Sequence, residues 1–252
     1  MLAVAAVSCP IPKPAPPGRD RVLLTHTTLV ALTPLIPLPF VDDMAKSRLQ
    51  RRMVRLLAQP YDLLLRPDDL ALLADDAPTN LVGGIVKGLV LTPLRSVLRK
   101  AFIVLAGNKM AEVASTCYHR GWLADRAFAR SFCAPEGPHS ARAVRTAIDE
   151  VMATVPVSSS PITAALKEGF GKSRTALERL VRTLRRRLGA LRGEPQQAEV
   201  EQAVDAAAAD ATTDDTTARG LDGIVSHLRR ALSEVPAAHF DELEQRLCDK
   251  LG

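Results

Sequence analysis

A run of twenty residues without lysine, arginine, aspartate or glutamate, from Val22 to Val41, constrains the fold of this chain more than any other feature. Its length matches that of a helix that crosses a bilayer. Three prolines interrupt it, and each removes a backbone donor and disfavours helix in the residue before it: Pro34, Pro37 and Pro39. We therefore expect a helix from about Val22 to Thr33, too short to span a membrane, and a non-helical stretch from Leu35 to Phe40. The sequence alone does not distinguish a run buried by protein from one inserted in a bilayer.

A basic amphipathic helix is predicted directly after the prolines. Asp42 or Asp43 can cap it, because a carboxylate accepts hydrogen bonds from the free N–H groups of a first turn. Its apolar face recurs at helical spacing through Ala45, Leu49, Met53, Leu56 and Leu57. The other faces carry five bases and no acid, which we predict to contact a membrane or another anion: Lys46, Arg48, Arg51, Arg52 and Arg55. Amphipathic basic helices of this kind are typical of proteins on anionic membrane surfaces.

Composition favours helices along the whole chain. Aromatic residues make up only 4% of it, and the abundant alanine, leucine and valine suit helices packed through aliphatic seams better than a β-sandwich or barrel. We therefore expect an all-α protein, a multi-helix bundle with apolar helices broken by proline. Its predicted parts are a disordered leader (1–20), an apolar helical core (21–134), a basic helical hairpin (139–193), an acidic disordered linker (194–219) and a C-terminal helical hairpin (220–252).

The second apolar block, from Asn80 to Pro135, completes the predicted core. A short helix that starts at Pro67 precedes it, with Asp68 and Asp69 in the first turn, and Pro78 ends that unit. From 97 to 132 the apolar spacing fits two helices that are joined or kinked around Gly107-Asn108.

A long second basic helix is predicted from Ser160 to Arg192. Ser160 is a suitable N-cap, and Pro161 occupies the first helical position, which proline favours. Its last part carries a leucine-rich stripe that we predict to be a partner seam: Leu177, Val181, Leu184 and Leu188. The other faces are rich in arginine, and we predict membrane or anion contact for Arg179, Arg182, Arg185, Arg186 and Arg187.

The segment from 194 to 218 reverses the sign of the charge, with seven acids and no base in an alanine and threonine background. Such a composition offers little apolar surface to offset the entropy of ordering, so we predict a disordered linker. The tail regains helical spacing on either side of Pro236. We expect a short hairpin there with six buried side chains: Ile224, Leu228, Leu232, Phe240, Leu243 and Leu247.

Sequence motifs give no catalytic, cofactor or metal site. The stretch from Gly169 to Ser173 has Leu166 where a phosphate-binding loop needs its first glycine, and it lies in a predicted helix. Cys117, His119 and Asp125 share one helical segment, where we expect Cys117 in the core and His119 at the surface. The four cysteines, including Cys9 and Cys248, show no ligand spacing and are predicted to be free thiols in a reducing cytosol. We therefore predict no enzyme, no cofactor and no metal.

The basic helices leave two interpretations of function. Nucleic acid is not the expected partner, because aromatic platforms and a helix-turn-helix signature are missing from the sequence. The first interpretation is a membrane-associated adaptor at an anionic surface, in the cytoplasm and peripheral to the inner membrane. The second is a soluble helical scaffold that binds a protein partner, or a second copy of itself, through its amphipathic seams.

The stretch from Leu35 to Tyr61 resembles a pattern in the helical membrane-associated domains of YcjF-type and EcsC-type bacterial proteins. In those families a Pro-Ile-Pro-Phe-x-Asp element precedes a helix with Leu-Gln, an Arg-Met pair and a following tyrosine. The matching residues are Pro37, Pro39, Phe40, Asp42, Leu49, Gln50, Arg52, Met53 and Tyr61. The present helix is richer in arginine, and the GTPase domain that accompanies some relatives is missing from this sequence. The resemblance implies a helical, membrane-proximal protein without a defined activity.

Overall fold

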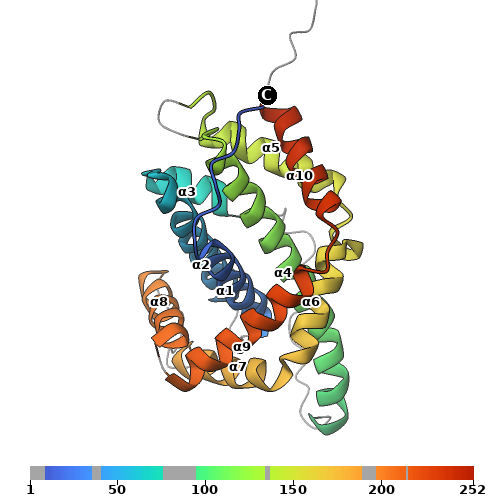
Figure 1. The fold of residues 1–252 in the computed structure, drawn as a ribbon. Helices are drawn as coiled ribbons and strands as arrows, with labels where there is room; N and C mark the ends of the chain where they lie inside the picture. Colours follow the sequence, from blue (N-terminus) through green and yellow to red (C-terminus); the bar gives the residue numbers. More distant parts are fainter. Residues whose placement is uncertain (1–8, 36–40, 76–94, 134–136, 189–196, 214) are drawn as a thin grey trace, which may run out of the picture.

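The structure is a computed structural model that describes residues 9–35, 41–75, 95–133, 137–188, 197–213 and 215–252 (Figure 1). Side chains are described over the same ranges except at 41–42, 95–107, 184–188, 197, 211 and 216. Within these ranges the protein is all-α, which confirms the predicted fold class. The helices are α1 (Arg19–Leu32), α2 (Val41–Ala58), α3 (Pro67–Ala74), α4 (Arg95–Ala129), α5 (Ala141–Thr154), α6 (Pro161–Lys172), α7 (Arg174–Leu188), α8 (Gln197–Thr213), α9 (Asp215–Leu232) and α10 (Ala237–Leu251), with short 3-10 turns at Thr33–Leu35, Gln59–Tyr61 and Val157–Ser159.

The proline-broken run begins as predicted. Helix α1 ends at Leu32, and a 3-10 turn follows in which the Thr33 hydroxyl donates to the Val30 carbonyl oxygen at 2.9 Å. Most of the stretch that we expect to be non-helical, 36–40, lies outside the described residues. Helix α2 begins at Val41, so Asp42 and Asp43 lie inside its first turn, and the prediction that one of them is the N-cap is wrong.

The described part of the uncharged run is buried by the protein itself. All ten residues from Leu23 to Leu32 are buried, including the polar His26 and three threonines. Helix α1 packs between α4, α2 and α9 (Figure 1). Among the described residues, no helix combines the length and the apolar character that crossing a membrane requires. This segment is therefore a core helix of the described fold.

Helix α4 is one continuous helix, so the predicted alternative of two separate helices joined at Gly107-Asn108 is wrong. A helical glycine costs about 1 kcal/mol relative to alanine and does not by itself end a helix. The helix packs against α1, α2 and α6. A Cβ at Gly121 would lie only 2.6 Å from Leu23 Cδ1 and 2.8 Å from Met53 Cε, so glycine permits this close crossing with α1 and α2.

The second basic helix is divided in two. Ser160 caps α6 as predicted, because its Oγ accepts from the Thr163 N–H at 3.1 Å and Pro161 begins the helix. The expected single helix to Arg192 is wrong, since α6 ends at Lys172 and α7 begins at Arg174. The residue between them, Ser173, is buried, and its Oγ is 2.9 Å from His227 Nδ1 on α9. The backbone N–H of Ser173 donates to the Phe170 carbonyl oxygen at 3.0 Å and closes the end of α6.

The acidic linker prediction is wrong for residues 197–213, which form helix α8, and for residues 215–219, which begin α9. Val200, Val204, Ala207 and Ala208 recur at intervals of four, three and one, which places them on one helical face. All four are buried against the rest of the fold. Helix α8 packs on α2, α7 and α9 (Figure 1). Tertiary packing of this narrow aliphatic face stabilises the helix and offsets the conformational entropy lost on ordering the segment. The composition of the segment does not reveal this packing.

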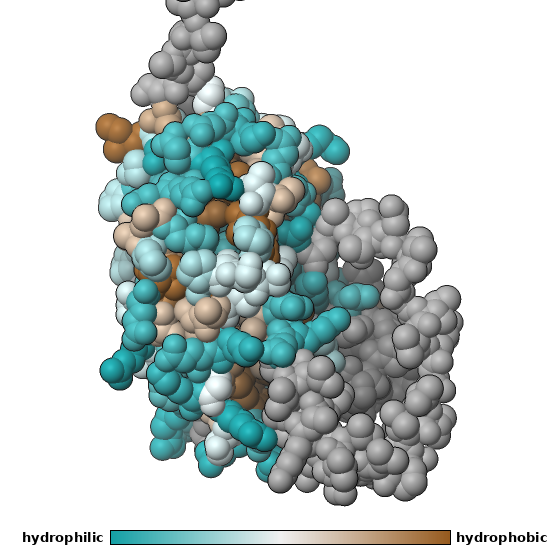
Figure 2. All heavy atoms as spheres, turned by 90° about the vertical axis from the view of Figure 1, so that its right-hand side faces the viewer, coloured by the Kyte–Doolittle hydropathy of each residue, from teal (hydrophilic) through white to brown (hydrophobic). Residues whose placement is uncertain are grey.

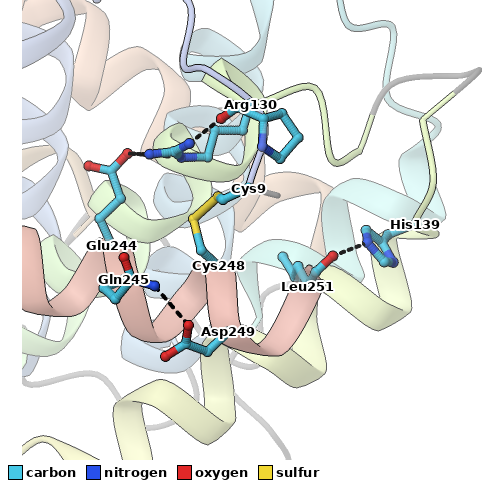
Figure 3. Close-up of a disulfide and its surroundings, with 9 residues drawn as sticks. Cys9, Arg130, His139, Glu244, Gln245, Cys248, Asp249 and Leu251 are labelled. Atoms are coloured by element: carbon cyan, nitrogen blue, oxygen red, sulfur yellow. Dashed lines mark hydrogen bonds and ion pairs between the residues drawn. A yellow bond between two sulfur atoms is a disulfide. The ribbon is translucent and has the colours of Figure 1, made fainter. Parts of the chain in front are cut away.

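The two ends of the described chain are joined by a disulfide between Cys9 and Cys248 (Figure 3). The prediction of four free thiols is therefore wrong for this pair, while Cys117 and Cys133 are free and buried. The segment before α1 is further held by a backbone hydrogen bond of 2.8 Å from Lys13 to Ala129. Arg130 donates both to the Pro10 carbonyl oxygen and to Glu244 on α10 (Figure 3). The described part of the leader is thus fixed to the body, contrary to the predicted disorder.

The buried apolar side chains form one cluster that runs from Leu23 on α1 to Leu251 on α10. The C-terminal hairpin belongs to it, and five of the six side chains predicted to be buried are so; Phe240 is half-buried. The ring centroid of Phe240 lies 5.4 Å from that of Trp122 on α4. Over the face seen in Figure 2, the described surface is mainly hydrophilic, with apolar residues in small separate areas.

Candidate functional site

The bases of α2 that sequence analysis selects are largely engaged by carboxylates of this chain. Arg51 pairs with Asp75, with Nε 3.0 Å from Oδ1, beyond the end of α3. The Ser47 hydroxyl also donates to that carboxylate. Lys46 is half-buried and has an interaction of its own. Arg55 alone among the five predicted contacts is exposed.

Helix α8 supplies the acids that engage the remaining two arginines of α2. Arg48 Nη2 lies 2.6 Å from Asp205 Oδ2, and its Nη1 lies 3.2 Å from Glu201 Oε2. Arg52 Nη1 lies 3.7 Å from the other oxygen of Asp205. The hydrogen bonds that Arg48 donates to Asp205 raise the pKa of the Arg48 guanidinium. The sequence places these acids some 150 residues after the arginines, so spacing along the chain gives no sign of the pairing.

Helix α7 presents its described arginines to solvent. Arg174, Arg179 and Arg182 are exposed, whereas Leu177 and Leu180 are buried against the core. Only Glu178 lies among them on this helix, 3.6 Å from Arg174. The remaining predicted contacts, Arg185, Arg186 and Arg187, belong to α7, but their side chains lie outside the described residues. The described part of α7 is therefore an apolar face turned inward and a basic face turned to water.

The predicted partner seam is partly occupied by the chain's own helices. Leu177 is buried and Val181 is half-buried, and α7 packs on α8 and α9. Leu180, which sequence analysis did not select, is more deeply buried than either. The side chains of Leu184 and Leu188 lie outside the described residues. Leu180 lies three residues after Leu177, so a stripe that takes the first interval as three instead of four would have included it.

The structure does not bring Cys117, His119 and Asp125 into one reactive group. His119 is completely buried, so the expectation that it lies at the surface is wrong, and its Nδ1 donates to the Ser115 carbonyl oxygen at 2.7 Å. Burial lowers the pKa of His119 to about 4 and raises that of Cys117 to about 12. The thiol is thus held in its un-ionised form, which is a poor nucleophile.

Asp125 belongs to a separate buried cluster at the start of α1. Its Oδ2 lies 2.7 Å from Arg19 Nε and 3.2 Å from Arg126 Nη2, and its Oδ1 accepts from the Tyr61 hydroxyl at 3.2 Å. The Arg126 guanidinium also lies 5.5 Å from the centre of the Trp122 ring. Every charged group in this cluster has a partner of opposite sign or an aromatic face. The cluster joins α1, α4 and the turn at Tyr61.

Among the described residues, no group of three or more histidine, cysteine, aspartate or glutamate side chains is arranged to hold a metal ion. Comparison of the chain with models of protein families, with curated proteins and with solved structures gives no match.

Proposed function

We propose that this chain is a non-enzymatic, peripheral membrane protein that acts as an adaptor at an anionic membrane surface, with α7 as its lipid-facing helix. The exposed arginine row of α7, above a buried apolar face, carries this proposal. A basic residue near an anionic bilayer contributes about 1 kcal/mol to binding. A row of several on one helix supports reversible attachment without a spanning segment.

The pairing pattern favours α7 over α2 as the first point of contact. Arg48, Arg51 and Arg52 already have carboxylate partners in this chain. Arg179 and Arg182 face water on a helix that is rich in arginine. Lipid phosphates can therefore approach Arg179 and Arg182 directly. To bind Arg48 or Arg51, they would first have to displace a carboxylate of this chain.

The compartment is part of the proposal. We predict a location on the cytoplasmic side of an inner membrane, whereas disulfides persist mainly in oxidising compartments. Counting the cysteines that react with a thiol reagent in rapidly quenched, denatured cells distinguishes the two. Four reactive cysteines place the chain in a reducing compartment, and two support an oxidising one, which would overturn the cytoplasmic location.

The test of the lipid contact is sedimentation with vesicles. Arg179→Gln/Arg182→Gln should weaken binding to vesicles of equimolar phosphatidylcholine and phosphatidylglycerol by roughly thirtyfold, since two contributions of about 1 kcal/mol are lost. Replacing Arg185, Arg186 and Arg187 with glutamine as well should lower the affinity for these vesicles by further orders of magnitude. Added salt should weaken the parent's binding, because it screens exposed charges.

Arg142→Gln/Arg230→Gln is the matched control. Both side chains are exposed, and they lie on α5 and on the last turn of α9. This variant loses the same net charge and should bind as the parent does. Equal weakening in both double variants would mean that net charge alone governs binding, and binding that survives loss of the α7 arginines would overturn the proposal.

A soluble scaffold that binds a protein partner is the second candidate. It is favoured by the half-buried Val181, which leaves part of the predicted seam accessible. If the parent does not sediment with acidic vesicles, this candidate replaces the first. Val181→Asp should then abolish binding of the partner, or self-association measured by sedimentation equilibrium.

A further inference from the structure

Helix α8 occupies the position that an anionic ligand of α2 would take. Its Glu201 and Asp205 reach Arg48, and Asp205 also faces Arg52. These three contacts are ion pairs between a helix with no basic residue and one that sequence analysis selects as an anion-binding surface. In this structure the carboxylates of α8 therefore satisfy charges that phosphate groups could satisfy equally well.

The ion pairs lie at the rim of the α2–α8 contact. The four side chains concerned leave between about a quarter and two fifths of their surface in water, from 27% for Glu201 to 38% for Asp205. Exposed pairs of this kind are screened by water and salt and hold two elements together only weakly. A multivalent anionic surface can compete with them.

The apolar part of the contact is small compared with that of the neighbouring helix. The buried residues of α8 within the described side chains are two valines and two alanines, Val200, Val204, Ala207 and Ala208. Helix α9 buries larger residues, among them Leu221, Ile224, Leu228 and Leu232. The stabilising free energy of apolar burial is proportional to the area removed from water. We therefore expect α8 to separate from the rest of the fold more easily than α9.

We propose that α8 is a removable acidic cover, defined by Glu201 and Asp205, over a second lipid-binding surface formed by Arg48 and Arg52 of α2. This inference rests on the proposed function, since the anion that displaces the cover is the phosphate surface of the membrane that α7 contacts. Helix α8 packs on α7 as well as on α2, so it contacts both the helix proposed to meet the membrane first and the helix whose arginines it covers (Figure 1). Contact then exchanges carboxylate partners for lipid phosphates.

The test removes the charges of the cover without changing the shape of its side chains. Glu201→Gln/Asp205→Asn should raise binding to vesicles of equimolar phosphatidylcholine and phosphatidylglycerol by about fivefold for each arginine released. Binding to vesicles of phosphatidylcholine alone should not change. The control Glu234→Gln/Asp241→Asn removes two exposed acids, one in the turn after α9 and one on α10, and should give a much smaller gain.

A second pair of changes shows whether the gain depends on α2. Adding Arg48→Gln/Arg52→Gln to Glu201→Gln/Asp205→Asn should cancel the gain, because the newly released arginines are then gone. A gain that persists in this quadruple variant would overturn the proposal. Circular dichroism of each variant confirms that it folds.

Hydrogen exchange in the parent gives a readout that needs no substitution. Acidic vesicles should speed exchange of the α8 backbone amides and leave those of α9 slow. Unchanged exchange in α8, together with equal vesicle binding by Glu201→Gln/Asp205→Asn and its control, would overturn the cover. If Arg179→Gln/Arg182→Gln still weakened binding in that case, the proposed function would stand without the cover. If neither the parent nor the uncovered variant bound acidic vesicles, both proposals would fall.

Discussion

The imidazole rings of His119 on α4 and His239 on α10 meet edge to face, with 6.0 Å between their centroids. The Nε2 atom of each ring is buried without a hydrogen-bond partner among the described residues. Because His119 Nδ1 donates to the Ser115 carbonyl oxygen, its Nε2 carries no proton. Protonation there would place a charge in the core beside a second imidazole.

Acid should therefore destabilise the fold through its buried histidines. Burial lowers the pKa of both His26 and His119 to about 4, from near 6.5 in an unfolded chain. Between these values the unfolded chain binds protons that the folded chain does not, so the free energy of unfolding falls as the pH drops from about 6.5 to 4. Urea unfolding at a series of pH values measures this slope.

His119→Asn removes one of the two groups and keeps an N–H that can reach the Ser115 carbonyl oxygen. The free energy of unfolding of this variant should depend less steeply on pH over the same window. Tyr118→Phe is the control at a neighbouring buried residue, because burial raises the pKa of Tyr118 far above this range. An unchanged slope in His119→Asn would contradict the assignment.

Loss of the disulfide should lower the free energy of unfolding by about 3–5 kcal/mol, because the bond closes a loop of 239 residues in the unfolded chain. Cys9→Ser, Cys248→Ser and the double variant should lose the same amount, since each breaks the same bond. Chemical denaturation of the three variants measures the loss. Unequal losses would mean that one cysteine matters for another reason.

Gly169→Ala should lower the free energy of unfolding by about 1–3 kcal/mol through overpacking at the crossing of α6 and α9. The new Cβ would lie 2.7 Å from Leu228 Cδ2 and 3.1 Å from its Cα, a backbone atom that cannot turn aside. Gly223→Ala is the control on α9, where a Cβ meets no atom within 4 Å. It should stabilise the protein by up to about 1 kcal/mol, the helix propensity gained. Equal effects of the two changes would contradict the close approach.

Asp125→Asn should cost about 3–5 kcal/mol of unfolding free energy, because it leaves the guanidinium groups of Arg19 and Arg126 buried without their counter-charge. Asp222→Asn breaks an exposed ion pair between Asp222 on α9 and Arg21 on α1. This change should cost less than about 1 kcal/mol of unfolding free energy. Thermal or urea unfolding compares the two directly. A mild effect at Asp125 would show that water reaches the cluster.

Local signals in the sequence sufficed for much of the helical framework. Proline positions located the end of α1, and Ser160 with Pro161 located the start of α6, because these effects act within a few residues. The predicted start of α3 at Pro67 is confirmed for the same reason. The break at Ser173 was missed, and the side-chain partner of this residue, His227, lies more than fifty residues away in the sequence.

The errors around α8 and the cysteines arise from contacts distant in sequence. The spacing of Val200, Val204 and Ala207 is a helical signal, but the acidic composition outweighed it. The bases Arg48 and Arg52 that accompany the acids of α8 belong to another part of the chain. Pairing of Cys9 with Cys248 likewise cannot be deduced from spacing. Of the candidate site, sequence analysis therefore located the basic helices and missed the carboxylates that engage α2.

The bond between Cys9 and Cys248 also determines how the molecule bears mechanical load. Tension applied between the two ends of the sequence passes through the S–S bond, so the helices between these cysteines are shielded from it. Once the bond is reduced, the same tension must be carried by the packing of α10 on α4 and α5. Resistance to pulling thus changes from covalent to non-covalent with a single two-electron reduction.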